Sequence, residues 1–160
     1  MNEIPRNEEV FERLYHQHSD TVYRICFTYL KNANDAQDAV QETFYKFLST
    51  KREFTSDEHV KAWLIVVASN YCKNLLKHWW RKREDIDNHM ELSGNHSVEM
   101  NETLKAVLNL PVKYKTVVYL YYYEGYDSGE IASMLKKPKS TIRDQLRTAR
   151  KLLKDLIGEA

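Results

Sequence analysis

The chain has 160 residues, of which 42% are hydrophobic and 29% are charged, and its formal net charge is +1. This length and composition exclude the intrinsically disordered class and allow one moderate hydrophobic core or two small ones. No apolar run approaches the roughly 20 residues of a membrane helix, and the N-terminus lacks the basic-then-apolar order of a secretion signal. We therefore expect a folded cytoplasmic protein without membrane insertion.

Apolar residues recur at helical spacing through the first part of the chain. The stretch DAQDAVQETFYKFL (35–48) predicts a helix with an apolar side and a polar side. The residues expected to pack inward are Ala39 or Val40, Phe44, Phe47 and Leu48. The outer polar strip consists of Asp35, Asp38, Gln41, Glu42 and Tyr45. A polar strip that local cations do not neutralise is able to dock another protein, although an ordinary solvated helix face has the same pattern.

A second helix, predicted at about 58–83, changes character along its length. Its apolar positions, expected in the core, are Trp63, Leu64, Val67, Ala68 and Tyr71. Its polar and then basic stripe consists of Asn70, Lys73, Asn74, Lys77 and Arg81. Residues 73–83 carry five positive charges and no acid, which suits contact with a nucleic-acid backbone. Trp79 and Trp80 are able either to stack on unpaired bases or to pack against the preceding helices.

The stretch 84–102 separates this module from the rest of the chain. Residues 84–103 hold six acids and no base, and Ser93, Gly94 and Asn95 stand near the middle of scattered, non-periodic apolar residues. This pattern is typical of a loop or tether. We therefore expect two domains, 1–83 and 103–160, joined by a flexible linker.

The second module is also predicted to be helical. TVVYLYYYEGY is rich in β-favouring residues. However, Leu110-Pro111 before it resembles a helix start, and Gly125 after it suits a helix C-terminus, so we predict a helix here as well.

The most informative stretch is YDSGEIASMLKKPKSTIRDQLRTARKLL (126–153). Asp127 and Glu130 have the spacing of a capping box at the start of a short helix, and KKPK breaks that helix before a longer one, whose first turn suits Pro138. The apolar face of the longer helix consists of Ile142, Leu146, Ala149 and Leu153, and its polar face of Ser140, Arg143, Asp144, Arg147 and Lys151. A helix with an apolar back and a cationic front, after a short helix and a turn, is typical of major-groove recognition, whereas a salt-bridged surface helix is the alternative.

These stretches resemble one known family. LPVKYKTVVYLYYYEGYDSGEIASMLKKPKSTIRDQLRTARKLL is similar to region 4 of the sigma-70 family, in its small extracytoplasmic-function type. FERLYHQHSDTVYRICFTYLKNANDAQDAVQETFYKFL resembles region 2 of that family, and VKAWLIVVASNYCKNLL resembles the promoter-melting helix that follows. The resemblance covers nearly the whole chain except the linker.

The resemblance implies an all-α fold with a region 2 helical bundle and a region 4 helix-turn-helix. It implies an alternative sigma factor that binds core RNA polymerase, at the clamp coiled coil of the largest subunit and at the flap, and directs promoter recognition. The docking residues would be Asp35, Asp38, Gln41 and Glu42, and the loop STKREFTSDEH (49–59) would hold a base flipped out of the duplex. An anti-sigma protein is a common further partner in the family.

The resemblance also assigns two DNA-contacting sets. The minus-10 element would be contacted by Asn70, Lys73, Asn74, Lys77 and Arg81, and the minus-35 element by Lys139, Ser140, Thr141, Arg143, Asp144 and Arg147. The turn departs from the family pattern, because Lys136, Lys137 and Pro138 stand where a glycine, a hydrophobe and a serine are usual.

No motif points to catalysis, a metal or another cofactor. The six histidines form no ligand-spaced cluster, and there is no glycine-rich phosphate loop, so we expect neither an enzyme nor a small-molecule substrate. Cys26 and Cys72 are expected to be buried free thiols. Two alternatives to a sigma factor stay open: a stand-alone helix-turn-helix regulator, and a helical adaptor whose basic patches bind acidic proteins.

Overall fold

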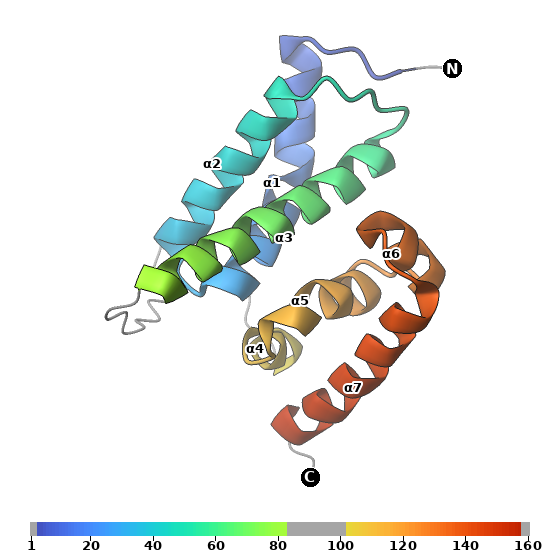
Figure 1. Cartoon of the computed structure of the whole chain (residues 1–160). Coiled ribbons are helices and arrows are strands. Elements are labelled where there is room, and N and C mark those ends of the chain that lie inside the picture. Colours follow the sequence, from blue (N-terminus) through green and yellow to red (C-terminus); the bar gives the residue numbers. More distant parts are fainter. Residues whose placement is uncertain (1–2, 83–101, 158–160) are drawn as a thin grey trace. The chain divides into compact units, whose positions relative to one another are not determined.

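The computed structural model describes residues 3–82 and 102–157, and every regular element within these ranges is a helix (Figure 1). The expected linker therefore lies almost entirely outside the described residues. Contacts between Cα atoms divide the chain into two compact units, residues 1–96 and 97–160. Within the described ranges, no helix is both long enough and apolar enough to span a membrane.

The first unit is a bundle of three long helices, α1 (Glu8–Leu30), α2 (Ala33–Ser49) and α3 (Asp57–Lys82), and each packs against both others (Figure 1). The side chains of Asn7 and Asn32 cap α1 and α2 by accepting hydrogen bonds from the amides of Val10 and Asp35, both at 2.9 Å. The Lys31 residue ends α1 in the left-handed conformation (φ 57°). Because Lys31 ends α1 and Asn32 caps α2, the connection between these two helices is very short.

The core of the bundle lies along the inner faces of the three helices. Phe44 and Phe47 of α2 are buried as expected, but Leu48 is 56% exposed, so its predicted inward packing is wrong. Leu48 follows Phe47 directly and is rotated about 100° away from it around the helix. On α3, Leu64 and Ala68 are buried.

The two cysteines meet in this core, between α1 and α3. Cys26 and Cys72 are both fully buried free thiols, as expected from their apolar surroundings in the sequence. A hydrogen bond with Cys72, followed by burial, raises the pKa of the Cys26 thiol well above its usual range. The thiolate form is therefore strongly disfavoured.

The second unit contains α4 (Glu102–Leu108), α5 (Val112–Val118), a π-helical turn η1 (Tyr119–Tyr123), α6 (Ser128–Leu135) and α7 (Lys139–Ile157). Its small core joins residues of α4, α5 and α7, among them Val107, Val118 and Ala149. The helix expected over TVVYLYYY is present, preceded by Pro111 and followed by Gly125 at φ 78°. The tyrosine-rich half of this helix is a π-helical turn, which the sequence did not predict.

The α6–α7 pair forms the predicted helix-turn-helix. Asp127 and Glu130 make a complete capping box at the start of α6. Lys136 ends α6 in the left-handed conformation (φ 58°), where the family pattern has glycine. Pro138 stands directly before α7 rather than inside its first turn, and its carbonyl accepts from the amides of Thr141 and Ile142.

Candidate docking and nucleic-acid interfaces

The polar side of α2 is open to solvent. Asp38 and Gln41 are exposed, whereas Asp35 and Glu42 are half-buried. Within the described residues, the side chains of Asp38, Gln41 and Glu42 make no hydrogen bond or ion pair. Three of the four predicted docking residues therefore keep their polar groups available to a partner.

An open groove of about 900 Å³ borders this strip. Aromatic and aliphatic side chains line it, including Phe11, Tyr15 and Phe44, and so do the acids Glu12, Asp38 and Glu42. Two apolar residues at its side are strongly exposed, Tyr45 at 65% and Leu48 at 56%. Apolar surface next to unpaired acids suits a protein partner that carries both apolar and basic side chains.

Tyr71 of α3 reaches the same groove. Its pKa is raised by burial first and then by the negative charge of Glu42, with smaller contributions from Cys72, Asp38 and Cys26. The hydroxyl of Tyr71 therefore stays protonated and able to donate a hydrogen bond at neutral pH.

The C-terminal half of α3 carries the predicted basic stripe. Asn70, Asn74, Lys77 and Arg81 are exposed and Lys73 is half-buried, and their spacing sets all five on one side of the helix. The neighbouring tryptophans differ: Trp80 is 77% exposed, whereas Trp79 is half-buried. The exposed ring of Trp80 is of the kind that stacks on an unpaired base.

Helix α7 turns a cationic face outward. Ile142, Leu146 and Ala149 are buried and Leu153 is half-buried, as the periodicity predicts. The outer residues Lys139, Ser140, Arg143, Asp144 and Arg147 are exposed, and Thr141 is half-buried. The structure thus brings the six predicted minus-35 residues to the first three turns of one helix.

Three of these side chains already have neighbours within the unit. Arg147 forms an ion pair with Asp144 one turn earlier on α7. The side chain of Lys139 lies against α6, because a Cβ added at Gly129 would be 3.6 Å from its Cε. Arg143, in contrast, makes no ion pair or hydrogen bond within the described part of the chain.

Sequence reasoning missed some contacts that shape this unit. The Lys115 side chain is buried, and its Nζ donates to the carbonyl of Leu108, the last residue of α4, at 3.1 Å. The Arg150 Nε donates to the Tyr122 hydroxyl at 3.4 Å and thereby joins α7 to η1. Neither contact has a sequence signal, because each joins an ordinary helical position to a distant residue.

Comparison with known proteins identifies the family. The model of Sigma-70 region 2 matches residues 14–84, and that of Sigma-70, region 4 matches residues 100–153. The RNA polymerase sigma factor SigV of Bacillus subtilis (strain 168) is 30% identical over 140 residues, which cover 86% of this chain and 84% of SigV. The chain belongs to the sigma-70 family, in its extracytoplasmic-function group.

Other relatives agree with this assignment. The ECF RNA polymerase sigma factor SigW of Bacillus subtilis (strain 168) is 23% identical over 92% of this chain and 89% of SigW. The sigma factor RpoE of Bartonella quintana, solved in a co-crystal with the anti-sigma factor NepR, shares the fold with a TM-score of 0.74 at 18% identity. That match covers 94% of this chain and 98% of RpoE.

The function follows from the family. This chain is an alternative sigma factor, which binds core RNA polymerase and directs promoter recognition and transcription initiation. Sigma factors are non-catalytic initiation factors, and the comparisons give no support to a stand-alone helix-turn-helix regulator.

Proposed function

We propose that residues 1–83 bind core polymerase and open the minus-10 element, that 84–102 form a linker, and that 103–160 read the minus-35 element. The division into two compact units supports this assignment, as do the separate matches to regions 2 and 4. The cytoplasm, where bacterial transcription takes place, is the proposed location.

The core-docking site lies in the polar strip of α2 and consists of Asp35, Asp38, Gln41 and Glu42. The observation that carries this proposal is that the polar groups of Asp38, Gln41 and Glu42 are unpaired within the described residues and lie beside a groove with many apolar side chains. Its partner would be the clamp coiled coil of the largest polymerase subunit. The flap of the polymerase would contact residues 103–160.

Co-purification with bacterial core RNA polymerase tests the docking site. The Asp38→Arg, Glu42→Arg double variant should lose core binding, because it places like charges against a basic partner. The Glu9→Arg, Asp20→Arg double variant has the same charge change on exposed positions of α1 outside the groove. It should bind as the wild type does, and equal binding by both double variants would reject the strip as the docking site.

The minus-10 site is the stripe of Asn70, Lys73, Asn74, Lys77 and Arg81, with Trp80 beside it. Exposed amide and ammonium groups next to an exposed indole ring support contact with an unpaired strand. Replacing Trp80 by alanine should weaken holoenzyme binding to a single-stranded promoter oligonucleotide by about 1–3 kcal/mol. Trp79→Ala is the comparison, because the Trp79 ring is half-buried and should affect stability instead.

The minus-35 site is the outer face of α7, with Lys139, Ser140, Thr141, Arg143, Asp144 and Arg147. Its exposed cationic groups on a helix of a helix-turn-helix support major-groove reading. An anti-sigma protein is a proposed further partner, supported by the shared fold of a sigma factor solved with one. Pull-down from the native host with a tagged chain checks this, and recovery of polymerase alone would argue against it.

A further inference from the structure

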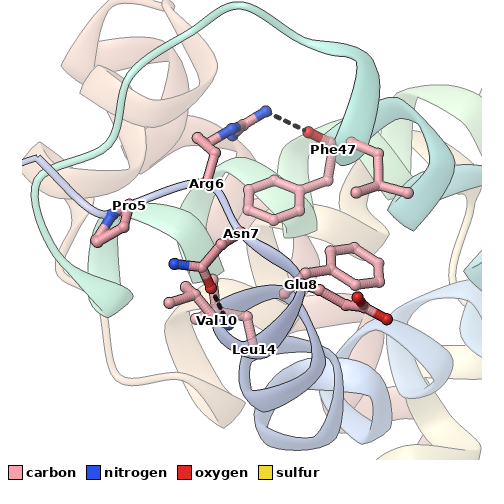
Figure 2. Close-up of a pocket in the computed structure, with 9 residues that line it drawn as sticks. Pro5, Arg6, Asn7, Glu8, Val10, Leu14 and Phe47 are labelled. Carbon is pink, nitrogen blue, oxygen red and sulfur yellow. Dashed lines mark hydrogen bonds between the residues drawn. The ribbon is translucent and has the colours of Figure 1, made fainter.

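The N-terminal segment before α1, residues 3–7, ties down the loop between α2 and α3. The Ile4 amide donates to the carbonyl of Phe54 at 2.8 Å. The Nη2 of Arg6 donates to the carbonyls of Phe47 and Thr50, both at 2.9 Å. Figure 2 shows the Arg6 side chain reaching the Phe47 carbonyl across the end of α2. These bonds connect residues more than 40 positions apart in the chain.

Arg6 occupies the C-terminal end of α2. The last carbonyls of a helix have no partner within the helix, and the dipole there favours a positive charge. Phe47 belongs to the last turn of α2, and Thr50 is its C-cap, where the backbone becomes extended. The guanidinium also lies over the Phe47 ring, 5.0 Å from the centroid. Arg6 therefore fixes the direction in which the chain leaves α2.

The loop that follows, residues 50–56, depends on this attachment. Phe54 is buried among Phe47, His59 and Trp63, whereas Lys51, Arg52, Glu53, Thr55 and Ser56 are exposed. The loop is thus hydrogen-bonded to the N-terminal segment at two points, Thr50 to Arg6 and Phe54 to Ile4. Between those anchors stand Lys51 and Arg52, whose cationic groups are turned to solvent.

We propose that Arg6 is a positioning residue for promoter opening, because it holds loop 50–56 in the geometry that presents Lys51 and Arg52 to the unpaired strand. In this role Arg6 acts through the loop and not through a DNA contact of its own. It lies before residue 14, where the match to region 2 begins. This inference rests on the proposed role of the first unit in opening the minus-10 element.

The test compares Arg6→Met with wild type in reconstituted holoenzyme. Methionine keeps the apolar stem over Phe47 but removes the charge and both hydrogen bonds. Holoenzyme affinity for a single-stranded minus-10 oligonucleotide should fall by about tenfold, with affinity for core polymerase unchanged. Arg6→Lys, which keeps the charge, should recover part of the loss. Lys46→Met removes the other cation at this helix end, which lies over Tyr71 rather than at the loop, and should behave as wild type.

A second measurement shows whether the loop has been released. Trypsin should cut the folded full-length Arg6→Met chain faster after Lys51 or Arg52 than it cuts the wild type. Faster cleavage with unchanged single-strand affinity would overturn the inference, as would unchanged cleavage, or equal loss of core and single-strand binding. If the wild-type holoenzyme itself does not bind the oligonucleotide, it is the proposed function that fails, and the cleavage comparison still reports the attachment of the loop.

Discussion

The basic stripe of α3 and the outer face of α7 both present cations on a helix, but the groups that accompany these cations differ. The stripe of α3 combines amides, ammonium groups and the guanidinium of Arg81 with the exposed indole of Trp80. The face of α7 carries two arginines, of which Arg147 is paired with Asp144 and Arg143 is not. An indole suits unstacked bases, whereas a guanidinium fork suits the edge of guanine in a duplex. The two units thus offer chemistry for two states of promoter DNA.

The largest expected effect tests whether the two units fold independently. Leu146 is buried in the helix-turn-helix unit, so Leu146→Ala should lower the free energy of unfolding of that unit by about 2–5 kcal/mol. All three tryptophans, Trp63, Trp79 and Trp80, lie in the first unit. In this variant, the part of the far-UV circular dichroism transition that comes from the second unit should therefore move to a lower denaturant concentration. The transition followed by tryptophan fluorescence should not change.

The reciprocal variant is Leu64→Ala, at a fully buried position of α3. This variant should shift the tryptophan fluorescence transition. The part of the circular dichroism transition that comes from the second unit should not change. Coincident shifts of both signals in either variant would show that the units unfold together.

The next effect concerns the two arginines of α7. Arg143→Ala should weaken holoenzyme binding to a minus-35 duplex by about 1–3 kcal/mol if Arg143 makes a bidentate base contact. Arg147→Ala should weaken this binding less, because Arg147 must first leave Asp144 before it can contact DNA. The difference should be small, since an exposed ion pair contributes only about 0–1 kcal/mol. Electrophoretic mobility shift at fixed salt measures both. Unaltered promoter binding by both variants would reject this face as the reading surface.

A pH-dependent effect is confined to the first unit. His18 of α1 is buried, its Nε2 has no hydrogen-bond partner among the described residues, and burial lowers its pKa below the ordinary 6.5. The charges of Asp57 and Glu58 oppose this shift, whereas those of Lys61 and Arg13 add to it. The unfolded chain therefore binds the proton more readily than the folded one.

The consequence is that stability is fully present above about pH 7 and decreases as the pH falls through 6.5 towards the folded-state value. Denaturation followed by tryptophan fluorescence at several pH values should show this decrease. In the His18→Leu variant, the free energy of unfolding should depend less on pH over this range. An unchanged pH dependence would assign the decrease to another group.

The smallest expected effect concerns a backbone feature found in both units, a lysine with positive φ at the end of a helix. Lys31 after α1 and Lys136 after α6 both have positive φ, at 57° and 58°. Replacement of either by glycine should relieve strain, at the expense of greater freedom in the unfolded chain, for a net gain of about 0.5–1 kcal/mol. Fluorescence should detect the gain at Lys31→Gly, and circular dichroism the gain at Lys136→Gly. A loss of stability in both would mean that the lysine side chains contribute more than the backbone strain costs.

Local sequence rules predicted the parts of the molecule that depend on neighbouring residues. The capping box of Asp127 and Glu130 and the buried face of α7 follow from residues within a few positions of each other, and both are present. The polar strip of α2 and the stripe of α3 were also placed on solvent-facing sides by their spacing. Their binding roles stay predictions.

What the sequence did not predict depends on contacts between distant residues. The attachment of Arg6 to Thr50 and the burial of Lys115 both join positions whose proximity only the folded chain creates. The exposure of Leu48 has a similar cause, because periodicity alone gave it a place beside Phe47, whereas the helices around α2 leave that side uncovered. The π-helical turn of Tyr119–Tyr123 likewise has no accepted residue pattern.

The burial of both cysteines has a practical consequence for following this sigma factor at work. Cys26 and Cys72 are the two cysteines of the chain, both are closed to solvent, and the raised pKa of Cys26 further slows its alkylation. A cysteine introduced at an exposed position in each unit, such as Asp20→Cys and Lys154→Cys, would thus be labelled by maleimide dyes against a silent background. Energy transfer between two such dyes would report the separation of the units in the free chain, in the holoenzyme and during promoter opening.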